Sequence, residues 1–401
     1  MNILISISDK IIALFTWLFS VHTLISILGV GFALGLVVMV HEWGHFIACR
    51  LLGIRVEEFS IGFGKLLKQW KDKKETVFSL RAIPLGGYVK PAGESYHREV
   101  EIKSEDEFAA RPWWARAIMV FAGAGMNYVL AFVIFFFIIF FMGLSVSDPV
   151  KIPSVLQDVQ EGYPAQAAGL MAGDKIVDIN GNKTNNWKDL ILTLNNAAKD
   201  NLQEVTLTYE RQGQRHTVDV PFGENNKIGI IVEPVYEKVG FFKSVYLAGY
   251  QCYYWTALSL KTIAEKIYHK QAPDMAGPIG IFELVGKGVH RGAEDYFFLI
   301  ALISVAIGMF NLFPIPILDG GHIVFFIIEG ITGKRPTEKF FNNACGVGAM
   351  ILISLVLFAT YQDVGRLRNK SANQTKIANA QVQAEQAPEA EIQTEQEAAN
   401  D

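Results

Sequence analysis

Four long runs of apolar residues dominate the pattern of hydrophobic and polar positions along the chain. They cover residues 24–47, 117–144, 297–318 and 344–361. A helix needs roughly 20 predominantly apolar residues to cross the hydrocarbon core of a bilayer, and each run is close to that length or longer. The pattern therefore predicts a polytopic α-helical membrane protein with about four transmembrane helices.

Between the first two runs, residues 55–90 alternate apolar and polar positions instead. A charged turn at residues 71–74 separates two such stretches, and this pattern favours β-hairpins over helices. We therefore expect a membrane-associated β-hairpin element. At a membrane its exposed strand edge could hold an unwound polypeptide, whose peptide bonds are no longer shielded by the hydrogen bonds of a helix. A plain cytoplasmic hairpin is the alternative.

Between the second and third runs, residues 150–236 form short strand-like stretches separated by glycine turns. Residues 162–181 combine a short helix closed by Gly169, a Gly-Asp turn, a strand and an Asn-Gly hairpin turn. Residues 187–197 are typical of an amphipathic helix and residues 204–210 of a strand. The string resembles a PDZ domain in its circularly permuted bacterial form, an inserted α+β domain. PDZ domains bind chain ends by strand addition, which makes a peptide C-terminus a candidate partner; steric obstruction of access is the alternative, and no groove residues can be named.

The remaining segments complete the domain plan. Residues 241–268 mix aromatic and apolar positions with Lys and Glu, which favours an amphipathic helix at the outer membrane surface over a fifth span. The end of the chain is rich in Ala, Gln and Glu and lacks aromatic residues, which predicts a disordered acidic tail. We expect an N-terminal extension at residues 1–23, the first half of the membrane core at 24–144, the PDZ domain at 150–236, a connecting segment at 237–296, the second half of the core at 297–365 and the tail at 366–401.

Composition narrows the class of protein. Apolar residues make up 51% of the chain and charged residues 19%, as in a membrane protein with a soluble part. The formal net charge of −4 indicates no nucleic-acid partner. Cys49, Cys252 and Cys345 lie far apart without a Cys-x-x-Cys motif, so we expect neither a disulfide nor a four-cysteine zinc site.

The distribution of positive charge predicts the orientation in the membrane. Residues 50–116 are rich in Lys and Arg, whereas Lys10 is the only basic residue before the first apolar run. The positive-inside rule therefore places residues 50–116 in the cytoplasm and residues 145–296 outside. The basic residues at 366–370 would place the end of the last span in the cytoplasm, which contradicts this orientation. The excess of Lys and Arg at residues 50–116 is larger, and we follow it.

Two motifs place metal-binding chemistry at membrane depth. A His-Glu-Trp-Gly-His motif at residues 41–45 lies at the end of the first apolar run, and on a helix His41 and His45 share a face and can reach one metal ion. Glu42 can activate water as a general base. Asp319, at the end of the third run, is the obvious third ligand, because ionisable residues within the membrane are functional candidates by default. Together these features predict proteolysis within the bilayer.

Other interpretations of the same motifs remain open at this point. Buried histidines with a glutamate could form a structural polar cluster between helices. The Asp-Gly pair at Asp319 is also ordinary turn chemistry after a proline-broken segment. Two His and a carboxylate with an open position also suit divalent metals other than zinc.

These motifs together resemble those of the site-2 proteases, and specifically the bacterial RseP-type branch. Besides the motif at 41–45, the resemblance rests on Gly62-Phe63-Gly64, the PDZ-like insertion, Gly277-Pro278-Ile279-Gly280, and Asn311 to Gly320 with Pro314, Pro316 and Asp319. It extends over residues 30–365 and implies an intramembrane zinc metalloendopeptidase. It implies one Zn²⁺ per chain, bound by His41, His45 and Asp319, with Glu42 activating water.

The resemblance also implies how substrate is handled. Asn311 would support the substrate or the developing oxyanion, and a membrane-reentrant β element would contact the substrate through Phe59, Ile61, Gly62, Phe63 and Gly64. The implied substrates are single-span transmembrane proteins already trimmed outside the membrane, such as anti-sigma factors or signal-peptide remnants. The implied location is the bacterial inner membrane, with the PDZ domain on the outer side and the active site towards the cytoplasm. Only one PDZ-like unit fits in this chain, where the best-known relatives carry two.

Two other classes of function compete with a protease. A catalytically silent scaffold that binds chain termini through its PDZ-like domain would bind no zinc and would not depend on Glu42, and the intact motif at residues 41–45 argues against it. A transporter with a helix broken at Pro314 and Pro316 should contain paired repeats, and the apolar runs show none.

Overall fold

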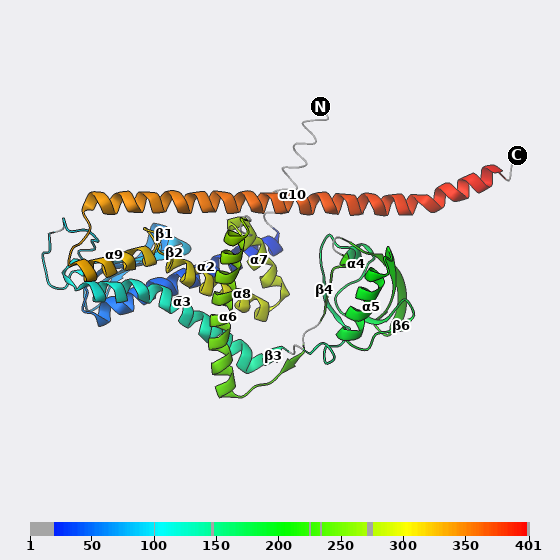
Figure 1. Cartoon of the computed structure of the whole chain (residues 1–401), viewed down its shortest axis with the longest axis horizontal. Coiled ribbons are helices and arrows are strands. Elements are labelled where there is room, and N and C mark those ends of the chain that lie inside the picture. The colour runs from blue at the N-terminus through cyan, green and yellow to red at the C-terminus, as the bar shows by residue number, and fades with distance from the viewer. Residues whose placement is uncertain are drawn as a thin grey trace, which may run out of the picture. The chain divides into compact units, whose positions relative to one another are not determined.

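The chain is divided into two compact units in the computed structural model (Figure 1). One unit joins the residues up to Phe141 to Gly240–Asp363, and the other contains Met142–Val239 and the residues after Asp363. The second unit thus contains the segment for which the sequence predicts an inserted domain. Residues 1–19 of the predicted N-terminal extension lie outside the described residues. The structure describes residues 20–99, 101–145, 148–223, 226–232, 235–270 and 276–398.

Four helices in the described part of the chain are long and apolar enough to cross a membrane, as the sequence predicted. Helix α6 (Phe241–Tyr268) lies wholly within the described residues and is not one of them. Its placement as an amphipathic helix at the outer membrane surface stays a prediction. The four are α2 (Val21–Leu51), α3 (Trp113–Met142), α8 (Ala293–Asn311) and the part Glu338–Asn369 of α10 (Glu338–Ala398).

The third span is shorter than the apolar run that predicted it. Helix α8 ends at Asn311, whereas the run continues to residue 318. Pro314 and Pro316 lack a main-chain N–H and cannot continue a helix, so residues 312–318 form a compact loop. Helix α9 (Asp319–Thr332) begins directly after this loop, which places Asp319 in its first turn.

The end of helix α10 also differs from the expectation. The sequence predicted a disordered tail at residues 366–401, whereas the helical backbone continues to Ala398. Alanine, glutamine and glutamate are good helix formers, and they dominate this stretch, which contains a single proline, Pro388, and no glycine after Gly365. A composition that buries little apolar surface is therefore still compatible with helical backbone.

The helices of the first unit pack through small and branched apolar side chains. Helix α7 (Pro278–Arg291) shares a core with α2 and α8 that contains Val30, Ala33, Val37, Val285 and Ile300. At its start, the buried carboxylate of Asp363 accepts hydrogen bonds from the main-chain amides of Gly277 at 3.2 Å and Gly280 at 2.8 Å. The Gly-Pro-Ile-Gly string thus begins a helix whose free N–H groups are satisfied by a side chain from α10.

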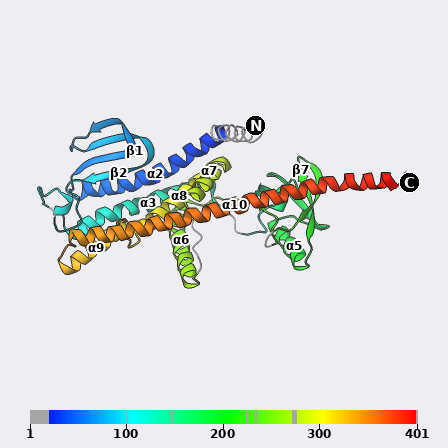
Figure 2. The ribbon, with the colours of Figure 1, turned by 90° about the horizontal axis from the view of Figure 1, so that it is seen from above.

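The predicted β element is present and lies along α2 (Figure 2). It consists of β1 (Val56–Lys71) and β2 (Val77–Pro91). The first part of β1 pairs with two parts of β2, so that Phe59 has Phe78 on one side and Val89 on the other. Its second part forms a hairpin in which Lys71 pairs with Val77. The last part of β2, around Val89, is therefore an outer strand of a sheet formed by folding two long strands back on themselves.

The two faces of this sheet differ in polarity. On one face Phe59 lies within 5.4 Å of Phe46 and 6.4 Å of Trp43, measured between ring centroids, so the sheet packs on the aromatic side chains of α2. On the other face Glu58 accepts hydrogen bonds from Ser79 and Arg81. Partial burial would raise the pKa of Glu58, but hydrogen bonds from Ser79, Tyr88 and Arg81 outweigh it and lower the pKa below its ordinary value.

The second unit has a core of its own. Its largest sheet has the order β6-β5-β7-β8, and β4 pairs with β9 beside it. Leu156, Ile176, Ile179, Leu190 and Leu207 are almost fully buried in this core. The unit contains β3 (Leu144–Ser145), β4 (Leu156–Val159), α4 (Pro164–Ala167), β5 (Lys175–Ile179), β6 (Asn182–Lys183), α5 (Trp187–Lys199), β7 (Glu204–Arg211), β8 (Gln214–Pro221), β9 (Ile230–Val232) and β10 (Tyr236–Glu237).

Arg211→Met is expected to destabilise the second unit by about 2–3 kcal/mol. The Asp174 side chain is 1% exposed and Arg211 donates to both its oxygens, at 2.7 and 2.8 Å. Removing one partner of a buried ion pair costs about 3–5 kcal/mol, and partial exposure of Arg211 reduces that value. Hydrogen–deuterium exchange of the full-length protein in detergent measures the effect. Lys151→Met, which breaks an exposed pair with Glu237, is the control and should change little; equal effects of both variants would contradict the prediction.

Candidate metal centre

Three side chains converge from α2 and α9 and could hold one metal ion. His41 Nε2 lies 3.1 Å from His45 Nε2 and 3.2 Å from Asp319 Oδ2. His45 Nε2 lies 3.7 Å from Asp319 Oδ2. Ligands held about 2.0–2.1 Å from a tetrahedral zinc ion are roughly 3.3 Å from one another. The observed spacings therefore match the geometry that a zinc ion requires.

The chemistry of the three donors also fits a metal ion. Asp319 Oδ2 is buried and accepts no hydrogen bond from any described residue. A buried carboxylate oxygen that accepts no hydrogen bond is costly, and coordination to a cation would satisfy it. His322, one turn after Asp319, does not belong to the group. Burial lowers the pKa of His322 to about 4, and its ring stacks on Tyr96 at 4.2 Å.

Local sequence explains why Asp319 points into this group. The loop before it is tight, with Leu318 N donating to Ile315 O, and Ile317 has a φ of 101°, which is strained for a β-branched residue. Gly321 packs against the main chain of Ile315, where a Cβ atom would collide with the carbonyl group. The two glycines after Asp319 have no side chains, so the loop at residues 312–318 can pack closely against the first turn of α9.

Glu42 lies next to the donor group but is not part of it. Its Oε2 accepts a hydrogen bond of 3.0 Å from the main-chain N–H of Val89 in the outer part of β2. This contact orients the carboxylate and leaves its second oxygen, Oε1, for a water molecule. The arrangement is the one that a general base requires, beside the metal ligands without being one of them.

The side chains of the predicted substrate-binding residues differ in their exposure to solvent. Asn311 is the last residue of α8, in the chain segment that leads to Asp319. Phe59 is 4% exposed and packs on α2, so it supports the sheet beside Glu42, whereas Phe63 is 45% exposed. Gly62 and Gly64 both have positive φ, and they flank Phe63 where β1 bends. Among the predicted aromatic contacts, the side chain of Phe63 is thus accessible and that of Phe59 is not.

Sequence reasoning missed the contribution of α3 to this centre. His45 Nδ1 lies 2.9 Å from the main-chain oxygen of Met119, and His41 Nδ1 lies 3.3 Å from the amide nitrogen of Asn127. Both partners belong to the second apolar run. Asn127 carries a polar side chain within that run, and this signal could have marked it because amides at membrane depth are rarely without a function.

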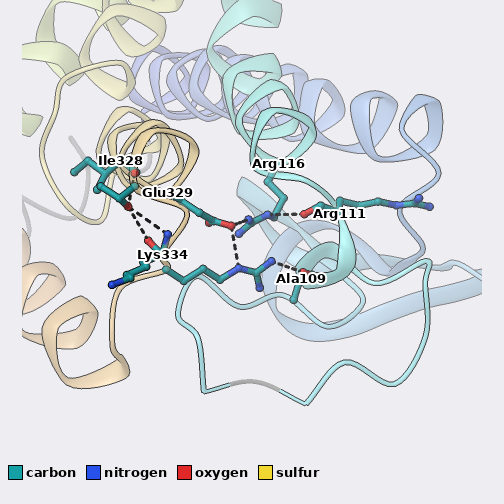
Figure 3. A network of polar contacts seen from close by, with 8 residues as sticks. Ala109, Arg111, Arg116, Ile328, Glu329 and Lys334 are labelled. Carbon is teal, nitrogen blue, oxygen red and sulfur yellow. Dashed lines mark hydrogen bonds and ion pairs between the residues drawn. The ribbon is translucent and has the colours of Figure 1, made fainter.

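A buried ion pair fixes the other end of α9 (Figure 3). Arg116 of α3 is fully buried and donates to Glu329, and its guanidinium lies 4.8 Å from the centre of the Phe326 ring. Arg335 also donates to Glu329 at 3.1 Å and to the main-chain oxygen of Ala109 at 2.8 Å. The helix that begins with Asp319 is therefore tied near its end to the start of α3.

The membrane-spanning helices, the β element and the His-His-Asp group with an adjacent glutamate define a membrane metalloprotease. The chain belongs to peptidase family M50, the site-2 proteases, which are zinc metalloproteases, and it matches that family over residues 30–355. This confirms the resemblance to site-2 proteases and the expectation of a zinc enzyme.

Bacterial proteins that match most of this chain are also named as zinc metalloproteases. Three of them are each named "Putative zinc metalloprotease". The one from Rickettsia conorii is 35% identical, over 86% of this chain and 99% of its own. The one from Brucella suis is 30% identical, over 83% and 93%, and the one from Fusobacterium nucleatum is 32% identical, over 84% and 97%.

Proposed function

We propose that this protein hydrolyses peptide bonds within the transmembrane segments of single-span proteins that have already been trimmed outside the membrane. The observation that carries the proposal is the meeting of His41, His45 and Asp319, with Glu42 beside them, between the membrane-spanning helix α2 and the start of α9. Anti-sigma factors and signal-peptide remnants are the substrate classes that fit. The enzyme would then act in regulated intramembrane proteolysis.

In this proposal His41, His45 and Asp319 hold one Zn²⁺. When bound, the zinc ion supplies Lewis acidity, which polarises the scissile carbonyl and lowers the pKa of water. Glu42 takes a proton from the attacking water and later passes it to the leaving amine. Its hydrogen bond from Val89 N–H holds the carboxylate in place during both transfers. Asn311 would support the substrate or the developing oxyanion.

The substrate would be held as an extended strand along the outer part of β2. The main-chain N–H of Val89 faces Glu42, so this strand edge borders the base. A substrate strand placed beside it would gain main-chain hydrogen bonds that replace those of its own helix. The exposed Phe63 and the neighbouring Ile61, Gly62 and Gly64 would contact side chains of the unwound segment, and Phe59 would support them from below.

The second unit would act on the outer side of the membrane as a PDZ domain. Among the described residues β9 pairs only with β4, which leaves a second edge of β9 for an added peptide strand. A peptide C-terminus bound there, or exclusion of untrimmed proteins by size, would select substrates. The basic residues at 50–116 support an inner-membrane enzyme whose active site faces the cytoplasm.

Glu42→Gln is expected to abolish cleavage while zinc stays bound. Purified full-length protein in detergent would be incubated with a single-span substrate that lacks its outer domain, and products would be identified by mass spectrometry. The glutamine keeps the shape of the side chain and cannot accept a proton, so the loss should be at least ~10²-fold, the lower end of the usual contribution of a general base. Zinc content would be measured on both proteins.

Two outcomes would count against the proposal. Cleavage by Glu42→Gln at the wild-type rate would remove Glu42 from the role of base. Absence of both cleavage and zinc in the wild type would favour a scaffold that binds chain ends through the second unit. A substrate that retains its outer domain tests the size filter in the same assay, and it should be cut more slowly.

A further inference from the structure

A fully buried amide side chain lies against one histidine of the metal centre. Asn127 is 0% exposed, and its Nδ2 lies 3.3 Å from His41 Nδ1. Its other amide atom, Oδ1, is buried and has no hydrogen-bond partner among the described residues. A buried amide oxygen without a hydrogen-bond donor lowers the stability of a protein. Asn127 takes no part in the hydrolysis described above, so its position beside His41 needs another explanation.

The tautomer of His41 supplies that explanation. His41 Nε2 faces His45 and Asp319, so Nε2 is the atom that can bind a metal. A neutral imidazole that binds a metal through Nε2 carries its proton on Nδ1, and this N–H needs an acceptor. With the amide nitrogen of Asn127 towards Nδ1, two donors would meet. With the amide turned by 180°, Oδ1 accepts the proton of Nδ1, and Nδ2 takes the place that Oδ1 held.

We propose that Asn127 is a positioning residue of the zinc site. Its Oδ1 accepts a hydrogen bond from His41 Nδ1–H and thereby fixes both the tautomer and the ring orientation of His41. The two amide atoms have the same shape and are assigned by their partners, and the required donor on His41 decides the assignment. The inference rests on the proposed role of His41 as a zinc ligand.

Asn127 lies on the face of α3 that contacts both histidines. Met119, Gly123 and Asn127 are four residues apart and so lie on one face of the helix. Met119 accepts from His45 Nδ1 through its main-chain oxygen, and Asn127 faces His41 Nδ1. Between them Gly123 offers only main chain, because a Cβ atom there would collide with both imidazole rings. Each histidine thus has one fixed partner on α3 for the ring nitrogen that does not face the metal.

Asn127 is itself held firmly in place. Ser304 of α8 donates to the main-chain oxygen of Asn127 at 2.8 Å, and both residues are fully buried. Gly308, one turn later on α8, lies so close that a Cβ atom there would be 3.2 Å from the Cβ of Asn127. The rigid contact between α3 and α8 leaves the amide free to rotate only about its own side-chain bonds, which is what a positioning residue requires.

The alternative is that Asn127 only joins helices, as buried polar side chains in membrane proteins often do. Zinc affinity separates the two roles. Full-length protein in detergent would be stripped of metal and titrated with Zn²⁺ against a chromophoric chelator. Asn127→Leu removes the acceptor at similar volume and should weaken zinc binding 10–100-fold, the usual effect of losing such a partner. Asn127→Asp keeps an acceptor and should bind zinc at least as tightly as the wild type.

Tyr128→Phe is the matched control. Tyr128 is the next residue on α3, and its hydroxyl makes an interhelical hydrogen bond of 3.0 Å to Thr256 that does not involve the histidines. We expect it to lower thermal stability without changing zinc affinity. Wild-type affinity in folded Asn127→Leu, or weakened affinity in folded Asn127→Asp, would overturn the inference while the proposed function stands. A wild type that binds no zinc would overturn the proposed ligands and this inference together.

Discussion

Asp319→Ala is expected to abolish tight zinc binding and to reduce cleavage by more than about 100-fold, since the loss of an outer partner of a ligand already costs 10–100-fold. Asp319 contributes the only carboxylate of the donor group, and it approaches His41 to 3.2 Å and His45 to 3.7 Å. Without it two neutral imidazoles would have to hold the ion alone. Asp319→Ala and Glu42→Gln should therefore differ in one respect, because only the first loses zinc.

Metal analysis after gel filtration, together with the cleavage assay, checks this result. Asp295→Ala is a suitable control, because Asp295 also lies in the first turn of a membrane helix, α8, and takes no part in the donor group. The control should retain zinc and activity. If Asp319→Ala kept a full equivalent of zinc with unchanged affinity, the third ligand would have to be another residue.

Glu329→Leu is expected to destabilise the first unit by about 3–5 kcal/mol, the usual cost of leaving a buried charge without its partner. Arg116 is fully buried, and Glu329 is the only carboxylate with which it pairs among the described residues. Removing Glu329 leaves this buried guanidinium without a carboxylate partner, and it also releases Arg335. Loss of the network frees the end of α9, so we expect zinc affinity to fall as well.

Thermal unfolding in detergent measures the loss of stability, and zinc titration measures its effect on the site. The double variant Arg116→Met with Glu329→Leu removes both charges of the pair and should recover most of the stability, because apolar replacement of a buried pair is often neutral. Arg55→Met breaks an exposed pair with Asp106 and should change stability little. A double variant as unstable as the single one would show that packing, rather than charge, holds α9.

The sequence predicted the features that depend on local spacing. His41 and His45 are four residues apart on a helix, and the four apolar runs have the length of a bilayer, so both could be recognised without a structure. The convergence of Asp319 with the two histidines was expected from chemistry and is seen in the structure. The end of the third helix was misplaced because hydrophobicity was followed past Pro314 and Pro316.

Contacts between distant segments could not be predicted in the same way. The hydrogen bond from Val89 to Glu42 joins residues 47 apart, and Asn127 lies 86 residues from His41. Periodicity gives the face of a helix or a strand, but it does not give the register between two elements. The double pairing of Phe59, with Phe78 and with Val89, likewise depends on how two long strands fold back, and alternation alone is compatible with a simple hairpin.

The hydrogen bond between Val89 and Glu42 has a consequence for how the enzyme tolerates mutation. The donor is a main-chain N–H, which nineteen of the twenty amino acids provide and proline alone lacks. Substitution of Val89 by any residue other than proline therefore keeps the N–H group that orients Glu42. The side chain at this position can therefore change while the carboxylate of Glu42 keeps its orientation.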